Sequence, residues 1–160
     1  MIKDNFDQLC TNFIKDFEKN DHLGKAASAG NRARAEVKAA DYDLAWRLYH
    51  EQKEHYLRHA SRCQFTQAQT LALDACASQD LANILRLEGK HDEALGHILY
   101  WICTSETPTK TQQQKLIAYF NRCKFKGVSH LDLHATVEIL CKNPEFIQTR
   151  NAVSRWRSIS

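Results

Sequence analysis

Histidine and cysteine side chains recur at helical spacing in the first half of the chain, where they could bind a metal ion. His55, His59 and Cys63 follow one another at intervals of four residues, which places them along one ridge of a helix. The first and third would lie about 12 Å apart along the axis, so one ion cannot bind all three. His130 and His134 form a second pair. We predict no metal site and expect these histidines to flank the core; a pair completed by ligands from elsewhere is the alternative.

The segment from His50 to His55 contains the residue types of a zinc-peptidase motif at the wrong spacing. HExxH requires histidine at position 54, where the chain has Glu54, and HxxEH requires it at position 51, which is Glu51. The glycine-rich nucleotide motifs and GxSxG are absent from the sequence, and no cysteine has the sequence context of a nucleophile. We therefore predict a protein that is not an enzyme, with no catalytic residue and no cofactor.

Basic residues are concentrated in the last third of the chain. Residues 110–160 carry a net charge of +6 and residues 1–109 carry −3. Aromatic and basic side chains interleave at Arg122-Cys123-Lys124-Phe125-Lys126 and again between Arg150 and Arg157, around Trp156. Proteins that bind single-stranded nucleic acid use such combinations. A nucleic-acid-binding regulator is therefore the alternative function, although an unevenly charged solvated surface is the favoured interpretation.

The cysteines and the apolar runs indicate a cytoplasmic protein. The six cysteines lie at least ten residues apart and form no CxxC motif, so we expect all six to be reduced and at least four to be buried. The N-terminus has no signal-peptide pattern. No apolar run approaches the roughly 20 residues that span a bilayer, so we expect no membrane association.

The apolar residues recur at steps of three and four along the whole chain, which predicts an all-α protein without a sheet. With 5 Gly and 2 Pro, the chain is also poor in turn residues. Seven to eight helices are expected, joined by short connections that favour antiparallel neighbours. Their predicted ranges are about 3–20, 25–40, 42–63, 66–88 with an interruption near 78–80, 92–104, 110–123, 129–142, and a short last helix opened by Asn143-Pro144.

Two segments resemble tetratricopeptide repeats. In the segment from Leu81 to Leu95, Leu81 and Ala82 match the Leu–small pair of a first helix, Gly89 matches the turn, and Ala94 matches the small residue of the second helix. In the segment from Lys38 to Trp46, Tyr42 and Ala45 match the start of a second helix. Ala45 and Ala94 are 49 residues apart, whereas the family repeat is roughly 34 residues. Longer helices or an additional helix must separate the two units.

At 160 residues, a single domain is expected over residues 1–160. The resemblance, which covers about half the chain, implies antiparallel helical hairpins stacked as a short right-handed superhelix. It also implies a protein–protein interaction module that binds a peptide or a partner helix in a groove. The groove would be lined by the first helices of each pair, at Asn31, Arg34, Asn83 and Arg86, whose side chains would hold peptide backbone or a carboxylate. A small residue at Ala94 would let its helix pack closely against Leu81 and Ala82.

Overall fold

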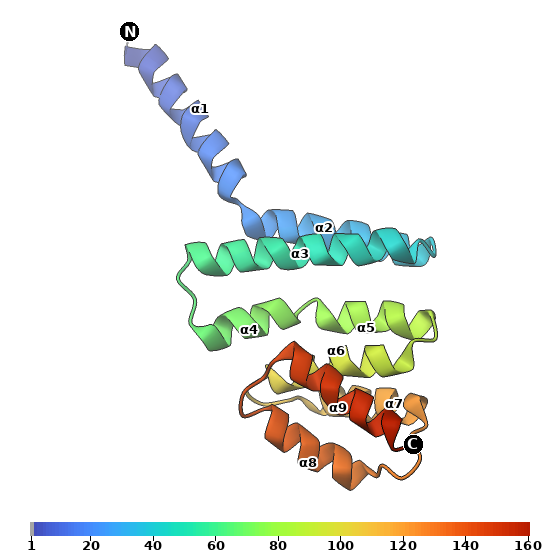
Figure 1. The fold of residues 1–160 in the computed structure, drawn as a ribbon. Coiled ribbons are helices and arrows are strands. Elements are labelled where there is room, and N and C mark those ends of the chain that lie inside the picture. The colour runs from blue at the N-terminus through green and yellow to red at the C-terminus, as the bar shows by residue number, and fades with distance from the viewer. Residues whose placement is uncertain (1) are drawn as a thin grey trace.

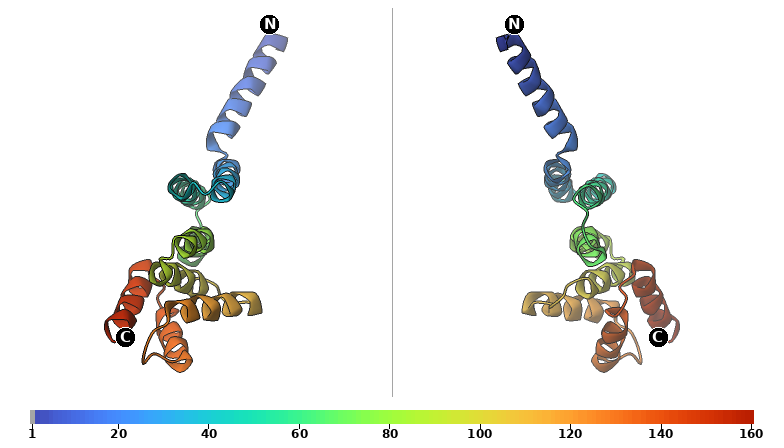
Figure 2. Two further views of the ribbon diagram at one scale, coloured as in Figure 1. Left: turned by 90° about the vertical axis from the view of Figure 1, so that its right-hand side faces the viewer. Right: turned by 90° about the vertical axis from the view of Figure 1, so that its left-hand side faces the viewer.

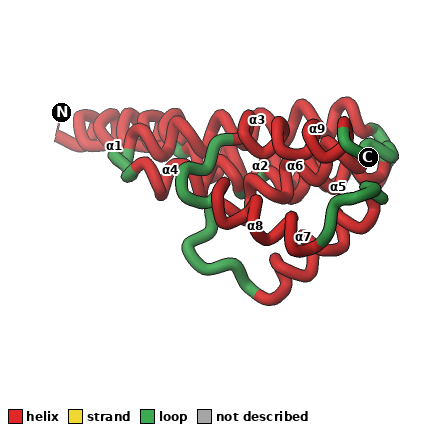
Figure 3. The backbone as a smooth tube through the Cα atoms, turned by 60° about the horizontal axis from the view of Figure 1, so that its bottom comes forward, coloured by secondary structure: helices red, strands yellow, loops and turns green. Residues whose placement is uncertain are grey.

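The computed structural model describes the backbone of residues 2–160 and the side chains from residue 8 onward. Over this range the chain forms nine helices joined by short connections, with no strand (Figures 1 and 3). The all-α class predicted from the apolar spacing is confirmed. The helices are α1 (Ile2–Asn20), α2 (His22–Lys38), α3 (Tyr42–Arg62), α4 (Gln67–Ala75), α5 (Ser78–Leu87), α6 (His91–Cys103), α7 (Lys110–Cys123), α8 (His130–Leu140) and α9 (Phe146–Ser158).

The predicted helical region 66–88 is two helices, α4 and α5. The break falls at Cys76 and Ala77, just before the predicted interruption, and Ser78 is already the first residue of α5. The Cys76 N–H donates to the Leu73 carbonyl at 3.2 Å, a bond to the third residue back that tightens the end of α4. Eight of the nine described helices, α2 to α9, pack against one another, in line with the predicted seven to eight, and α1 is the additional one.

Side-chain caps start most of the helices. Thr66, Thr109 and Ser129 each form a capping box with the third helical residue, and Asp41 accepts from the Leu44 N–H at 3.0 Å. Gly89 follows α5 with φ +76°, a conformation that glycine adopts without strain. The last helix begins later than predicted, because Pro144 lies outside it and α9 starts at Phe146.

Helices α2 and α3 pack as a close antiparallel pair because the buried residues of α2 are all small. Ala26, Ala29, Gly30 and Ala33 are all buried. A Cβ atom at position 30 would collide with the side chain of Gln52 on α3. The glycine therefore weakens the isolated helix but permits the close approach of the two helices.

Helix α6 lies at the centre of the main core. Every residue from Ala94 to Tyr100 is buried, and α5, α7 and α9 all pack against this helix. Ala94 is fully buried in the same cluster as Ala82 of α5, as expected for the small position of a tight hairpin. The views in Figure 2 show α2–α3, α4–α5 and α6 as successive layers, with α7, α8 and α9 beyond them.

A polar link and an aromatic contact join the α2–α3 pair to the rest. The Tyr100 hydroxyl of α6 donates to Asp74 Oδ2 of α4 at 2.8 Å, and Lys53 Nζ of α3 lies 3.4 Å from the other oxygen. Trp46 of α3 packs against the main core and against the apolar cluster that α2, α3 and α5 share, and it meets the ring of His97 edge-on at 5.8 Å. These contacts fix α3 relative to α4 and α6.

Helix α1 projects away from the other helices (Figures 1 and 2). Its apolar face is consequently exposed: Leu9, Phe13, Ile14 and Phe17 keep between 54% and 73% of their surface accessible. Patches of exposed large apolar side chains are typical of surfaces that contact another molecule. Along residues 2–160, no helix combines the length and apolar character needed to cross a bilayer.

The burial of the cysteines differs from the prediction. All six are free thiols, but only Cys103 and Cys123 are buried. Cys63 and Cys76 are exposed because they lie at the C-terminal caps of α3 and α4, where the chain turns at the surface. The expectation of at least four buried thiols was wrong, because sequence neighbours do not show which side of a helix end faces solvent.

Replacing Ala94 with leucine should destabilise the protein, because the added atoms must enter the α5–α6 contact, where Ala94 has no exposed surface. We expect a cost of about 1–3 kcal/mol, which corresponds to a fall in Tm of roughly 2–12 °C at this chain length. Thermal unfolding followed by circular dichroism measures it. The control Glu93→Gln changes an exposed side chain and should melt like the parent. An unchanged Tm for Ala94→Leu would contradict the tight α5–α6 contact.

Two phenylalanines should differ sharply in their contribution to stability. Phe13→Ala removes a ring that is 73% exposed, so Tm should stay within about 2 °C of the parent. Phe120→Ala removes a buried ring that packs against Trp156 at 5.8 Å and should cost about 3–5 kcal/mol. If Phe13→Ala lowers Tm as much as Phe120→Ala, then α1 packs against the other helices in solution.

Acid should destabilise the core through His97. Burial lowers the pKa of His97 to about 3 from 6.5, and the positive charges of Lys53, His50 and Arg150 add to this effect. Because the folded protein resists protonation and the unfolded chain does not, this stability is present above pH 6.5 and is lost as the pH falls towards 3. Between pH 7 and pH 5 the loss is about 2 kcal/mol.

His97→Leu should therefore flatten the pH dependence. Its Tm should fall less between pH 7 and pH 5 than the parent's, by roughly 4–8 °C. His134→Gln, at an exposed position, should keep the parent's pH dependence. If Tm falls equally between pH 7 and pH 5 in His97→Leu and in the parent, His97 is protonated without cost in the folded state.

Candidate functional site

The four residues predicted to line a groove form two Asn–Arg pairs of the same design. On α2, Arg34 Nη2 donates to Asn31 Oδ1 at 2.6 Å. On α5, Arg86 donates to Asn83 Oδ1 from Nη2 at 2.7 Å and from Nε at 3.2 Å. Each asparagine thus holds the guanidinium three residues later. These hydrogen bonds restrict the arginine side chains, so a further contact of either guanidinium would cost less conformational entropy.

The charges that act on the Asp80 carboxyl indicate that the two Asn–Arg pairs lie near one another. Burial raises the pKa of its carboxyl, and two cations lower it: Arg34, which comes from α2, and Lys115, which comes from α7. Asp80 lies on α5, one turn before Asn83. Side chains of three helices that are separate in the sequence therefore act on one half-buried carboxylate.

Tyr119 extends this region along α7. Burial raises the pKa of its hydroxyl, and Arg86 lowers it through its charge and a hydrogen bond. The guanidinium of Arg122 lies 5.4 Å from the centre of the Tyr119 ring, within the range of a cation–π contact. Asp80 also acts on Tyr119. The α5 pair Asn83–Arg86 and the α7 pair Tyr119–Arg122 are thus neighbours.

Two tyrosines of α3 complete the region beside Arg34. Burial raises the pKa of Tyr49 to about 12, with Asp80 raising it further and Arg34 opposing. Burial also raises the pKa of Tyr56, and both Arg34 and Asp80 act on that hydroxyl. The Tyr56 hydroxyl accepts a hydrogen bond from Gln52 Nε2 at 3.2 Å.

We refer to this set as the polar face. It comprises Asn31, Arg34, Tyr49, Tyr56, Asp80, Asn83, Arg86, Lys115, Tyr119 and Arg122. Of these, Tyr49 and Tyr119 are buried. Four permanent cations share it with one carboxylate. Such a surface attracts carboxylates, which can accept paired hydrogen bonds from a guanidinium.

Four members of the polar face were predicted from the sequence, and the other six were not. Two of the missed residues, Tyr119 and Arg122 of α7, had a signal in the sequence. Asn31–Arg34, Asn83–Arg86 and Tyr119–Arg122 share one spacing, with the arginine three residues after its partner in α2, α5 and α7. The same pattern therefore pointed to α7. The tyrosines of α3 and Asp80 carry no such signal, because only the packing of the helices brings them beside Arg34.

The histidine pairs considered as metal ligands contact neighbouring side chains instead. The sulfur of Cys63 lies 3.7 Å from His59 Nε2, while the ring of His55 stacks on that of His22 at 5.9 Å. His130 Nε2 lies 2.8 Å from Asn121 Oδ1. His134 lines an apolar hollow of about 580 Å³ between α7 and α8. Within the described residues, no three potential ligands gather at a point where a metal ion would fit.

The aromatic residues of the basic C-terminal segments belong to the core. Trp156 is 7% exposed, and its ring packs against Phe125 at 5.8 Å. Arg157 lies over Phe125 at 4.7 Å and makes two hydrogen bonds of 2.7 Å to Asp92, which hold the pKa of that carboxyl below its usual range. These rings are not free to stack on bases.

No protein-family model, no curated protein and no solved structure matches the chain. Its function is therefore argued from the polar face and from the helices that carry it.

Proposed function

We propose that the protein is an interaction module that binds an acidic peptide segment of a partner protein on the polar face. One observation carries this proposal: Arg34 and Lys115 act on the Asp80 carboxyl, and Arg86, Arg122 and Asp80 act on the neighbouring Tyr119, so four cations from three helices share one region with a single carboxylate. Cations that gather on one surface repel one another. An arrangement of this kind is stabilised when a ligand supplies the missing negative charge.

The types of side chain favour a peptide over a small anion. Arginines supply forked donors for a carboxylate, asparagines supply donors and acceptors for a peptide backbone, and Tyr56, which is partly exposed, supplies flat contact area with a polar end. Asn31 and Asn83 lie on different helices and occur with the same arginine spacing. An extended segment with acidic residues could contact both pairs in succession.

The proposal includes a tetratricopeptide-like arrangement. Helices α2 and α5 are the first members of the hairpins α2–α3 and α5–α6, and α7 packs on α6 next to the second hairpin. In arrays of this type, first helices line the surface that binds peptides. The proposal also assigns the protein to the cytoplasm, where exposed thiols such as Cys63 and Cys76 stay reduced.

The alternative of nucleic-acid binding has less support. Single-strand binders need aromatic rings that are free to stack on bases, and Phe125 and Trp156 are packed against each other and against Phe120. The basic residues of the C-terminal third also include Arg157, which Asp92 neutralises.

Fluorescence anisotropy with a short labelled peptide rich in glutamate tests the proposal. The parent should bind it, and affinity should fall as salt is raised. Arg34→Gln and Arg86→Gln should each weaken binding roughly ten-fold or more, because each removes a charge-assisted hydrogen bond. Both variants should melt close to the parent, since the side chains lie at the surface or partly exposed.

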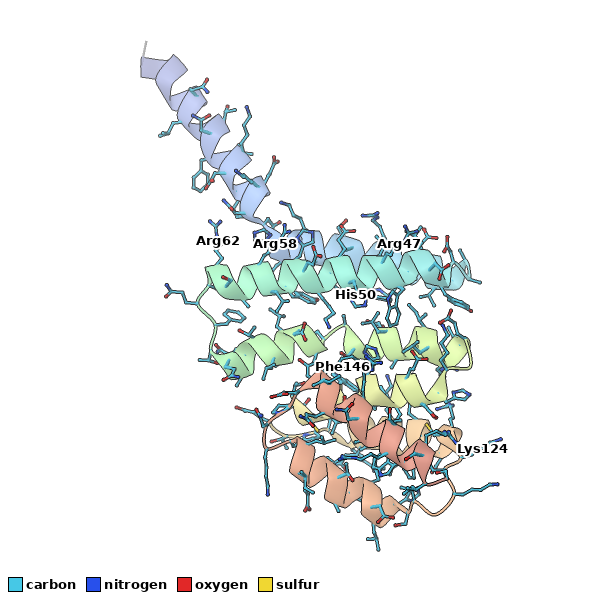
Figure 4. All side chains as sticks on the ribbon, in the orientation of Figure 1. Arg47, His50, Arg58, Arg62, Lys124 and Phe146 are labelled. Carbon is cyan, nitrogen blue, oxygen red and sulfur yellow. The ribbon has the colours of Figure 1, made fainter. Side chains whose placement is uncertain are left out.

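Arg62→Ala provides the matched control. Arg62 lies at the C-terminal end of α3 near the base of α1, outside the polar face (Figure 4), so its loss should leave the affinity unchanged. A lysine-rich peptide should not bind. The proposal is wrong if Arg62→Ala weakens binding as much as Arg86→Gln, or if a single-stranded oligonucleotide binds far more tightly than the acidic peptide.

A further inference from the structure

Cys103 and Cys141 form a dithiol between helices that are distant in the sequence. Cys103 is the last residue of α6, and Cys141 caps the C-terminal end of α8. Their Sγ atoms lie 2.7 Å apart. Each of the other four cysteines lies apart from this pair, and in the described part of the chain no second pair of sulfurs is in contact.

The dithiol opens onto a hollow at the surface. Both cysteines line a hollow of about 410 Å³, together with Gln67, Leu71 and Lys142. This volume suits a small molecule. Cys141 is half-buried at this hollow, and Cys103 is buried behind it in a cluster with Leu140 and Ala152. One thiol is thus accessible, and the other is protected but within reach of it.

The two thiols differ in acidity. The hydrogen bond between them raises the pKa of Cys103, and burial raises it further. The same bond lowers the pKa of Cys141. The thiolate is the nucleophile in thiol–disulfide exchange, so Cys141 is suited to attack and Cys103 to resolve.

We propose that Cys103 and Cys141 are a thiol–disulfide exchange site whose substrate is a small-molecule disulfide, RSSR. The Cys141 thiolate attacks one sulfur of RSSR, which forms a mixed disulfide and releases RS⁻. The Cys103 thiol then loses its proton and attacks the Cys141 sulfur, which forms the Cys103–Cys141 disulfide and releases the second RS⁻. The small disulfide is reduced to two thiols, and the protein dithiol is oxidised by the same two electrons.

The bond would fasten α8 to the centre of the core. Helix α8 buries only Leu133 and Leu140 and leaves Leu131 and Ile139 at 80% and 68% exposure. The link would close a chain segment of 38 residues, and restricting a segment of that length in the unfolded chain raises Tm by on the order of 10 °C. Formation of the disulfide would therefore raise the stability of the fold in addition to oxidising the two thiols.

Treatment of the full-length protein with oxidised glutathione tests the site. Digestion without reductant, followed by mass spectrometry, should show a linked peptide pair containing Cys103 and Cys141, and Tm should rise. Cys103→Ser should instead trap glutathione on Cys141, because the resolving thiol is absent. Cys141→Ser should leave Cys103 unmodified, because its thiol is buried.

The exposed thiols provide the internal comparison. Cys63 and Cys76 can form glutathione adducts but have no partner thiol. If adducts accumulate on these two residues while Cys103 and Cys141 stay unlinked, the exchange site is overturned. The same conclusion follows if Cys103→Ser carries no adduct at Cys141.

Discussion

The burial of α6 is the constraint on which the rest of the structure depends. A helix that is apolar around most of its circumference must be covered on several sides. The unbroken buried run from Ala94 to Tyr100 is covered by α5, α7 and α9. The two polar side chains in this run, His97 and Tyr100, differ in their hydrogen bonding. The Tyr100 hydroxyl reaches Asp74, whereas His97 Nδ1 has no partner and the ring is enclosed by Trp46 and Phe146, where burial disfavours its protonation.

The polar face is a consequence of this packing. Because α5 and α7 both bury their apolar sides against α6, their remaining polar side chains lie near each other. This brings Asp80 and Arg86 of α5 beside Lys115 and Tyr119 of α7. The close α2–α3 pair then adds Arg34. Cations from three helices are thus brought together, while in the part of the chain that the structure describes the buried core contains no Asp, Glu, Lys or Arg. Asn31 and Asn83 each hold an arginine by hydrogen bonds.

The sequence predicted those features that depend on residue spacing within one helix. The small residue Ala94, the turn at Gly89 and the all-α class are examples. Spacing within a helix does not show what covers it: α1 has the same amphipathic pattern as the core helices, yet Phe13 and Phe17 are exposed. Nor does it show contacts between helices. Asp80 lies beside Lys115, and Cys103 beside Cys141, because α6 positions α5, α7 and α8 around itself.

The most direct test of the proposed binding surface is a nuclear magnetic resonance titration of the isotopically labelled protein with the glutamate-rich peptide. Side-chain signals of the arginines and asparagines report on the polar face, while methyl and aromatic signals report on the exposed apolar residues of α1. The account predicts that the largest shifts occur at Arg34, Asn83, Arg86 and Tyr119, with signals of Leu9 and Phe13 unchanged. Shifts confined to α1, or spread evenly over the basic residues of the surface, would contradict it.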